Sequence, residues 1–254
     1  MEKGTVRMLG IVLVIHVSYS YIHEYDRRYT STKSIFLIRS PRMYGMVLLE
    51  DGVLTCTNLR IYCIMRLGPV WLMQPIPYFG EQLTEEWLSE PKIDGWRLQI
   101  LHYANGHTEC WGRRLENEPN WSHKLPAIAK AARTLPKGTL IDCELCSTGG
   151  RRFIPSLFAK KPKVKPIVYV FDVIFLANKN ISKRTLKKRK QMLSELKLTQ
   201  PLIAVPGQPL HNIQTSMQEA IAHGHEGIVI KKLNSTYLLG RDAPMATENW
   251  RKIK

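Results

Sequence analysis

Two runs of alternating apolar and polar residues, separated by an Asn-Gly pair, most constrain how this chain can fold. Residues 96–103 read Trp-Arg-Leu-Gln-Ile-Leu-His-Tyr, and a strand-like pattern resumes at 107–111 after Asn105-Gly106. Alternation with a period of two is typical of a half-buried strand, and Asn-Gly between such runs is a strong hairpin signal. The sequence therefore predicts an antiparallel hairpin over residues 96–111.

The same periodicity analysis predicts a mixed domain over residues 71–254. We expect strands at 139–145, 167–176 and 227–230, and helices at 125–135, 182–196 and 216–223. Ser182 is the expected N-cap of the second helix, whose Leu186, Leu193 and Leu196 would face the core. Strands that alternate with single helices indicate an α+β fold with antiparallel sheets flanked by helices.

Residues 1–70 form a separate N-terminal segment in which we identify no chemical motif. Glu50-Asp51-Gly52 resembles a hairpin turn between residues 46–49 and 53–54. The segment is open to two interpretations, an accessory element or an extension of the reading frame upstream of Met73. The apolar run at 8–17 is short for a signal peptide and is interrupted by His16. We expect a monomeric intracellular protein (cytoplasm or nucleoid, or nucleus) that does not bind membranes.

The charge of the chain favours a polyanionic partner. Lys and Arg number 37 against 21 Asp and Glu, a formal charge of +16. Clustered cations release counterions from phosphate backbones, although a basic protein that is merely soluble fits equally well. The basic stretches at 160–165 and 183–190 are predicted to be solvated faces suited to sequence-independent contact with DNA.

The cysteine and histidine spacings do not indicate a metal centre. Cys143 and Cys146 have CxxC spacing, but no second Cys or His pair accompanies them, and in a strand they would face opposite ways. Buried thiols are the favoured interpretation. His223-Gly224-His225 is interpreted as a loop that leads into the strand at 227–230.

Six short motifs occur in a fixed order. They are PKIDGWR at 91–97, GRR at 112–114, IDCEL at 141–145, YVFDVIF at 169–175, EGIVIK at 226–231 and WRKIK at 250–254. Each is ambiguous alone, since Asp94-Gly95 and Glu226-Gly227 could be simple turns. Together, over residues 85–254, they resemble the motifs of the covalent nucleotidyltransferase superfamily, and specifically the adenylation domain of ATP-dependent DNA ligases.

The resemblance implies an ATP-grasp-like nucleotidyltransferase domain that uses ATP and Mg²⁺. Lys92 would be the catalytic nucleophile, forming lysyl-AMP in order to seal nicks between a 5′-phosphate and a 3′-hydroxyl. A lysine nucleophile must be neutral, and free lysine has a pKa of about 10.4. Lys252 and Lys254 would contact the α-phosphate and supply cations that lower the pKa of Lys92.

The remaining motif residues match nucleotide and metal contacts of that family. Glu226 would hold the divalent metal, and Glu144 would bind the ribose or share in metal binding. Arg97 and Arg113 match arginines that contact ribose and phosphate, with Arg114 as an alternative to Arg113. Phe171 would stack on the adenine, and Glu90 would contact the edge of the base.

Relatives of this type carry an OB-fold domain after the last motif, whereas this chain stops at Lys254. We therefore expect no C-terminal OB-fold in this chain. The expected partners are nicked duplex DNA and a separate OB-fold domain or a sliding clamp. Two alternatives stay open at this point: an RNA ligase or capping-type nucleotidyltransferase, or a catalytically weak module that binds nicks.

Overall fold

The computed structural model describes residues 13–15, 35–37, 46–49, 52–55, 67–240 and 242–254. The chain divides into two compact units, Met1–Ile64 and Met65–Lys254. In the first, β1 (Leu13–Ile15) pairs with β2 (Ile35–Leu37), and β3 (Met46–Leu49) with β4 (Gly52–Thr55), both antiparallel. The predicted hairpin at β3 and β4 is thus confirmed. Its turn residues 50–51, like most of the apolar run at 8–17, lie outside the described residues.

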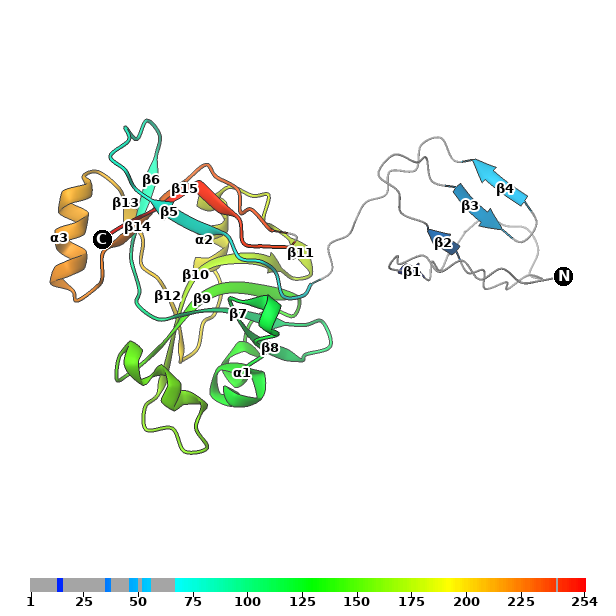
Figure 1. Ribbon diagram of the computed structural model, residues 1–254, viewed down its shortest axis with the longest axis horizontal. Helices are drawn as coiled ribbons and strands as arrows, with labels where there is room; N and C mark the ends of the chain where they lie inside the picture. Colours follow the sequence, from blue (N-terminus) through cyan, green and yellow to red (C-terminus); the bar gives the residue numbers. More distant parts are fainter. Residues whose placement is uncertain (1–12, 16–34, 38–45, 50–51, 56–66, 241) are drawn as a thin grey trace. The chain divides into compact units, whose positions relative to one another are not determined.

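Two sheets form the frame of the second unit (Figure 1). The six-stranded sheet has the order β11 (Lys179–Asn180), β10 (Pro166–Leu176), β9 (Thr139–Ser147), β7 (Trp96–His102) and β8 (Thr108–Gly112), with β12 (Leu202–Ala204) paired to β10. The five-stranded sheet has the order β13 (Gln208–Pro209), β6 (Trp87–Pro91), β14 (Ile228–Lys232), β15 (Ala246–Ile253) and β5 (Gln74–Pro77). Neighbours are antiparallel, except that β12 runs parallel to β10 and β5 parallel to β15. The predicted hairpin over 96–111 is confirmed as β7 and β8.

Alternation along the strands divides the apolar side chains between two cores. Leu98 and Ile100 of β7 point into a core that also holds α1, whereas Leu101 points into a core shared with the five-stranded sheet. That second core contains Phe171 of β10 and Trp250 of β15. Because successive side chains on a strand face opposite ways, the polar residues in phase with Leu101 also face the other sheet.

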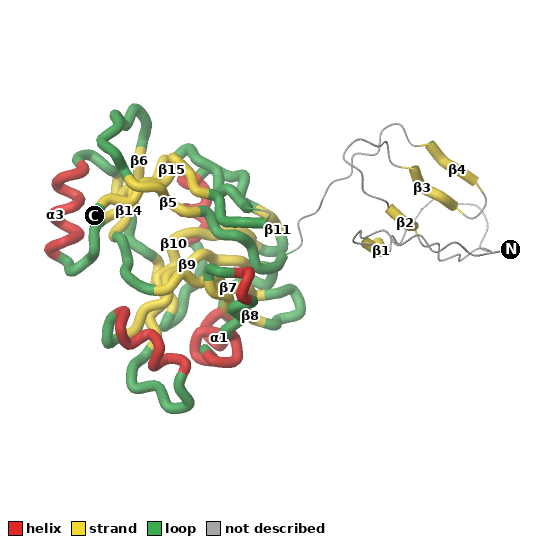
Figure 2. The backbone as a smooth tube through the Cα atoms, viewed as in Figure 1, coloured by secondary structure: helices red, strands yellow, loops and turns green. Residues whose placement is uncertain are grey.

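Three α-helices cover the outer faces of the described domain. They are α1 (Pro126–Ala132), α2 (Leu186–Ser194) and α3 (Ile213–Ala222). The domain also contains the 3-10 helices η1 (Leu115–Asn117) and η2 (Ser122–Lys124) before α1, and η3 (Arg151–Phe158) between β9 and β10. The helices appear in red in Figure 2, with α1 beside β8 and α3 beside β14. No helix among the described residues is long and apolar enough to cross a membrane.

The predicted helix boundaries are partly wrong. Ser182 is not the N-cap of α2, because its carbonyl accepts the amide of Tyr237 at 2.8 Å; Thr185 caps the helix instead. The helix predicted at 216–223 starts earlier, since Asn212 accepts the amide of Thr215 at 3.0 Å. The helix predicted at 125–135 ends early, consistent with the proline at 136, which disfavours helical backbone in the preceding residue.

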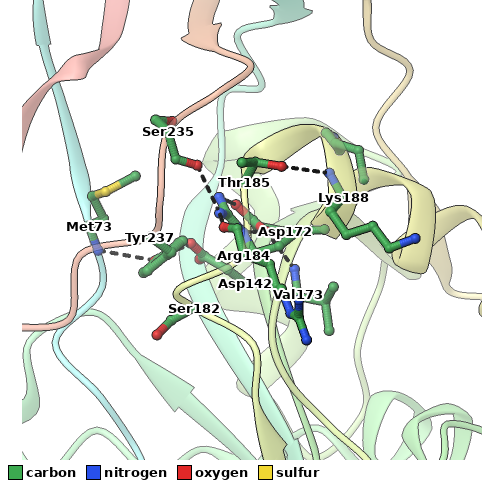
Figure 3. A network of polar contacts seen from close by, with 12 residues as sticks. Met73, Asp142, Asp172, Val173, Ser182, Arg184, Thr185, Lys188, Ser235 and Tyr237 are labelled. Carbon is green, nitrogen blue, oxygen red and sulfur yellow. Dashed lines mark hydrogen bonds and ion pairs between the residues drawn. The ribbon is translucent and has the colours of Figure 1, made fainter.

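A buried ion pair fixes α2 to the six-stranded sheet. Arg189 donates two hydrogen bonds to Asp172 of β10, both 2.8 Å long, and neither side chain is exposed to solvent. A further guanidinium nitrogen donates to the carbonyl of Arg184 at 2.6 Å. Figure 3 shows Asp172, Arg184 and Ser235 gathered in this polar network. The pairing satisfies both charges at a depth where a single charge would be costly.

Replacing Arg189 with methionine should strongly destabilise the domain. The variant leaves the carboxylate of Asp172 buried without its partner, so we expect the free energy of unfolding to fall by about 3–5 kcal/mol. The double variant with Asp172→Leu should recover part of that loss. Urea denaturation of both variants and of Lys188→Met, an exposed control on the same helix, measures the effect. A loss for Arg189→Met no larger than for the control would contradict this account.

Candidate active site

A cleft of about 850 Å³ opens between the two sheets. Eight of the nine side chains that the sequence analysis selected line it: Glu90, Lys92, Arg97, Arg113, Glu144, Phe171, Lys252 and Lys254. The ninth, Glu226, forms ion pairs with two of them, Lys92 and Lys254. Residues up to 164 positions apart in the sequence therefore meet in one cavity of mixed polar and apolar character, the usual form of a small-molecule site.

Lys92 follows β6 in a loop that packs directly on β9. Its amide donates to the carbonyl of Gly227 at 2.8 Å, which aligns the loop with the start of β14. A Cβ atom at Gly95 would lie 2.4 Å from the carbonyl oxygen of Leu145 and 2.8 Å from Cγ of Glu144. Only glycine fits there, so the Asp94-Gly95 step brings the Lys92 loop against Glu144.

The ammonium groups of Lys92 and Lys254 both bind the carboxylate of Glu226. These hydrogen bonds lower the pKa of Glu226 to about 2, and the bond from Lys254 makes the larger contribution. Glu226 is therefore ionised at any physiological pH. Lys254 lies beyond the end of β15, the strand that pairs with β14, so the ion pairs connect the last strand to the Lys92 loop.

Arg97 is held by a carboxylate that the sequence analysis did not select. Its Nε and Nη2 atoms each donate to Asp142 at 2.6 Å, and Nη2 also donates to the carbonyl of Met73 at 3.0 Å. The hydroxyl of Tyr237 donates to the same carboxylate at 2.6 Å, and Figure 3 shows Tyr237 beside both Met73 and Asp142. Much of the guanidinium of Arg97 is thus committed to protein contacts.

Glu144 faces the cleft from β9, in register with Arg97 of β7 and Tyr169 of β10. Burial raises the pKa of Glu144 to about 7, although the charges of Arg97 and Lys92 oppose the shift. The carboxyl group therefore exchanges its proton near neutral pH. In this position it can act as a hydrogen-bond acceptor when ionised and as a donor when protonated.

Phe171 presents an aromatic ring that is also in contact with cations. The guanidinium carbon of Arg97 lies 4.5 Å from the ring centroid, and Nζ of Lys231 lies 4.6 Å from it. Trp250 packs edge to face at 6.4 Å between centroids. A ring held this firmly, and still lining the cleft, is suited to stacking against a flat ligand.

Lys231 is a buried cation that the sequence analysis quoted within a motif but gave no role. Nζ donates to Glu90 at 2.6 Å and lies 4.1 Å from the ring centroid of Trp250. Burial lowers the pKa of Lys231, whereas Glu90 opposes the shift. A lysine in the apolar strand Ile228–Lys232 was itself a signal, because a buried charge requires a partner.

The basic run at 183–190 is not a uniform solvated face, which corrects the sequence interpretation. Lys183, Arg184, Lys187 and Lys188 are exposed, as are Lys160, Lys161, Lys163 and Lys165 of the other stretch. Arg189 is fully buried, and Lys190 is mostly buried in an ion pair with Glu90. Both point inward because they flank the face of α2 that carries Leu186 and Leu193.

Two exposed arginines follow β8 at the edge of the cleft. Arg113 and Arg114 are both exposed and both line the cleft, so either can reach a ligand there. Arg151, which no motif contained, also lines it and forms an ion pair with Asp94. Cys143 and Cys146 are buried free thiols on β9, and the His223 ring contacts the carbonyl of Glu219 at 2.8 Å within the α3 terminus.

Residues 73–254 match the family model described as the ATP dependent DNA ligase domain. The chain is 30% identical over 183 residues to a DNA ligase of Methanothrix thermoacetophila, covering 65% of this chain and 31% of that protein. It is 31% identical over 175 residues to the SPbeta prophage-derived DNA ligase-like protein LigB of Bacillus subtilis, covering 66% of this chain and 61% of that protein. The chain thus spans about a third and about three fifths of these two relatives.

Solved structures resemble the fold. A mycobacterial DNA ligase D complexed with ATP and MES has a TM-score of 0.57 at 19% identity, with 71% of this chain and 59% of that chain covered. A Lig E DNA ligase structure has a TM-score of 0.52 at 18% identity, with 72% and 68% covered. The expected α+β nucleotidyltransferase fold with antiparallel sheets is confirmed.

The raised pKa of Glu144 predicts a measurable pH dependence. The pKa of about 7 in the folded state exceeds the ordinary value of 4.5 for glutamate, so the folded state binds more protons between these pH values and loses stability as the pH rises through them. Glu144→Gln cannot ionise. We expect its free energy of unfolding, relative to wild type, to increase by about 1–3 kcal/mol between about pH 5 and about pH 8.

Urea denaturation at several pH values gives this difference directly. Glu248→Gln, which changes an exposed carboxylate on β15, is the matched control and should run parallel to wild type. Parallel curves for Glu144→Gln and wild type would show that Glu144 titrates as an ordinary surface carboxylate.

Proposed function

Because the chain belongs to the ATP dependent DNA ligase domain family, we propose that it is the catalytic core of an ATP-dependent DNA ligase whose Lys92 becomes covalently adenylylated. The observation that carries the proposal is the meeting of Lys92, Glu226 and Lys254 beside a cleft that is also lined by Phe171 and Glu90. A nucleophile, a carboxylate, a second cation and an aromatic surface are thereby available to one bound nucleotide.

In the proposed first step, the amine of Lys92 attacks the α-phosphorus of ATP. The nitrogen lone pair forms a P–N bond, the bond from phosphorus to the bridging oxygen breaks, and pyrophosphate leaves with that electron pair. The ammonium group gives one proton to water before the attack, and the nitrogen gives a second proton to water once the P–N bond has formed. Lys92 must therefore leave its ion pair with Glu226, because an ammonium group has no lone pair to offer.

Cations around Lys92 support this reaction. Lys252 and Lys254 line the same cleft, and positive charge beside the α-phosphate stabilises the negative charge that develops on its oxygens. Lys254 already occupies one oxygen of Glu226. It can remain there while Lys92 turns toward phosphorus, so that Glu226 is not left without a cation.

The carboxylates of the cleft fit Mg²⁺ only in its usual partly hydrated form. No group of three or more His, Cys, Asp or Glu side chains that could hold a metal occurs among the described residues. Mg²⁺ commonly takes one or two carboxylates and completes its shell with water and substrate phosphates. Glu226, with Glu144 as the second candidate, would hold the ion, which when bound would neutralise phosphate charge.

Other cleft residues would hold the nucleoside. Phe171 would stack on the adenine, Glu90 would accept a hydrogen bond from the base edge, and Glu144 would bind the ribose. Arg113 or Arg114, both exposed at the cleft, would contact phosphate, to which a planar guanidinium is well matched. Asp142 already binds two nitrogens of Arg97. Arg97 would therefore contribute mainly by packing against the ring of Phe171, and less by direct contact with the nucleotide.

Two further steps would use DNA as the substrate. AMP would pass from Lys92 to the 5′-phosphate of a nick, and the 3′-hydroxyl would then displace AMP to form the phosphodiester bond. The formal charge of +16 and the exposed lysines between 160 and 165 support binding to the phosphate backbone, which weakens as salt concentration rises.

The proposal predicts that the protein retains one AMP on Lys92 after incubation with α-labelled ATP and Mg²⁺. Lys92→Ala should lose the label completely, because the residue that forms the P–N bond is gone. Intact-mass and peptide mass spectrometry locate the adduct. Lys130→Ala, an exposed lysine on α1, is the control and should label as wild type does; GTP in place of ATP tests the base.

Nicked DNA that already carries AMP on its 5′-phosphate provides a second readout that bypasses the first step. The proposed function fails if wild-type protein retains no label and Lys92→Ala also matches wild type on this adenylylated substrate.

A further inference from the structure

Glu90 is buried within an unusual set of charges. Only 3% of the residue is exposed. Its Oε2 atom accepts from Lys231 of β14 at 2.6 Å, and its Oε1 atom forms an ion pair with Lys190 of α2. Lys190 is not among the described residues that line the cleft, whereas Glu90 and Lys231 both are. One carboxylate at the cleft is therefore held by two lysines from different elements, one of them outside the cleft.

Two separate cations fix the orientation of this carboxylate. A single lysine on one oxygen would restrain the orientation of the carboxylate only through that contact, since the last torsion of glutamate has broad wells. A second lysine on the other oxygen narrows the range of that torsion further. The lone pairs not used by the lysines then point in a constant direction, and each carboxylate oxygen can accept more than one hydrogen bond.

Glu90 carries one negative charge and has two lysine partners, so Lys190 is not needed to neutralise it. Lys231 and Glu90 alone form a balanced buried pair, in which 3% of each side chain is exposed. Removing Glu90 would leave two cations unpaired, but removing Lys190 leaves the balanced pair in place. Helix α2 is anchored independently by Arg189 and Asp172. A role in orientation therefore explains Lys190 better than a role in folding.

We propose that Lys190 is a positioning residue that holds Glu90 in the orientation that recognises the 6-amino group of a purine. The inference rests on the proposed function, because it assumes that the cleft binds ATP. Lys190 would act only through Glu90 and would touch neither the base nor the phosphates. Its effect should therefore be confined to nucleotides that can donate a hydrogen bond from the 6-position.

The test compares ATP with purine riboside 5′-triphosphate, which lacks the 6-amino group. Isothermal titration calorimetry on the full chain gives the affinity of wild type and of Lys190→Met for each nucleotide. We expect wild type to prefer ATP by about tenfold or more, the size expected for a hydrogen bond to a charged acceptor. Lys190→Met should lose most of this preference by weakening ATP binding alone, with the affinity for the analogue unchanged.

Two further variants separate positioning from other effects. Lys190→Arg retains a cation that can reach Glu90 and should keep part of the preference. Lys197→Met removes an exposed cation just beyond α2 and should behave as wild type with both nucleotides. Urea denaturation of Lys190→Met should remain close to that of wild type.

The possible failures are distinguishable. If Lys190→Met weakens both nucleotides equally, or keeps the wild-type ratio, the positioning role is wrong while the proposed function stands. The same holds if wild type binds both nucleotides equally. If wild type binds neither nucleotide and forms no adduct with ATP, the proposed function itself is overturned, and the inference with it.

Discussion

The carboxylate of Asp142 is the group on which the arrangement of the cleft depends. It is fully buried on β9, where an unpaired charge would cost several kcal/mol. Arg97 satisfies it from β7, and Tyr237 satisfies it from the segment before β15. The Tyr237 hydroxyl also accepts the amide of Met73 at 3.1 Å. The requirement to pair one charge thus ties the six-stranded sheet to the segments that lead into the five-stranded sheet.

The other buried charges follow the same rule, and each pair joins different elements. Asp172 and Arg189 join β10 to α2, and Glu90 and Lys231 join β6 to β14. Apolar packing can tolerate small shifts between layers, but a buried ion pair loses most of its value if its geometry is poor. These pairs therefore specify how the layers dock, and they place Phe171 beside Arg97 and Lys231 at the cleft.

Sequence periodicity predicted β7, β8, β9, β10 and β14 of the second unit but not β5, β6 or β15. Motif order was sufficient to select the residues that meet at the cleft. Lys92 and Glu226 are 134 positions apart, so no local pattern could pair them; only the order of the motifs did. Helix starts were less predictable. Ser182 has the right chemistry for a cap, but its carbonyl is occupied by Tyr237, a contact that depends on the tertiary fold.

The inward position of Lys190 could have been predicted from the sequence. It was missed because residues 183–190 were interpreted as a single solvated face. Leu186 and Leu193 of α2 are buried, and Arg189 and Lys190 lie three and four residues after Leu186. Residues at this spacing share a helix face, so both cations had to point toward the core and find carboxylates there. Lys187 and Lys188 lie on the exposed side. One helix therefore presents cations outward to solvent, where a polyanion can bind, and cations inward, where they fix Asp172 and Glu90. Substitutions on α2 should accordingly separate by helix face: outward changes alter the surface charge, whereas inward changes act on the buried carboxylates of Asp172 and Glu90.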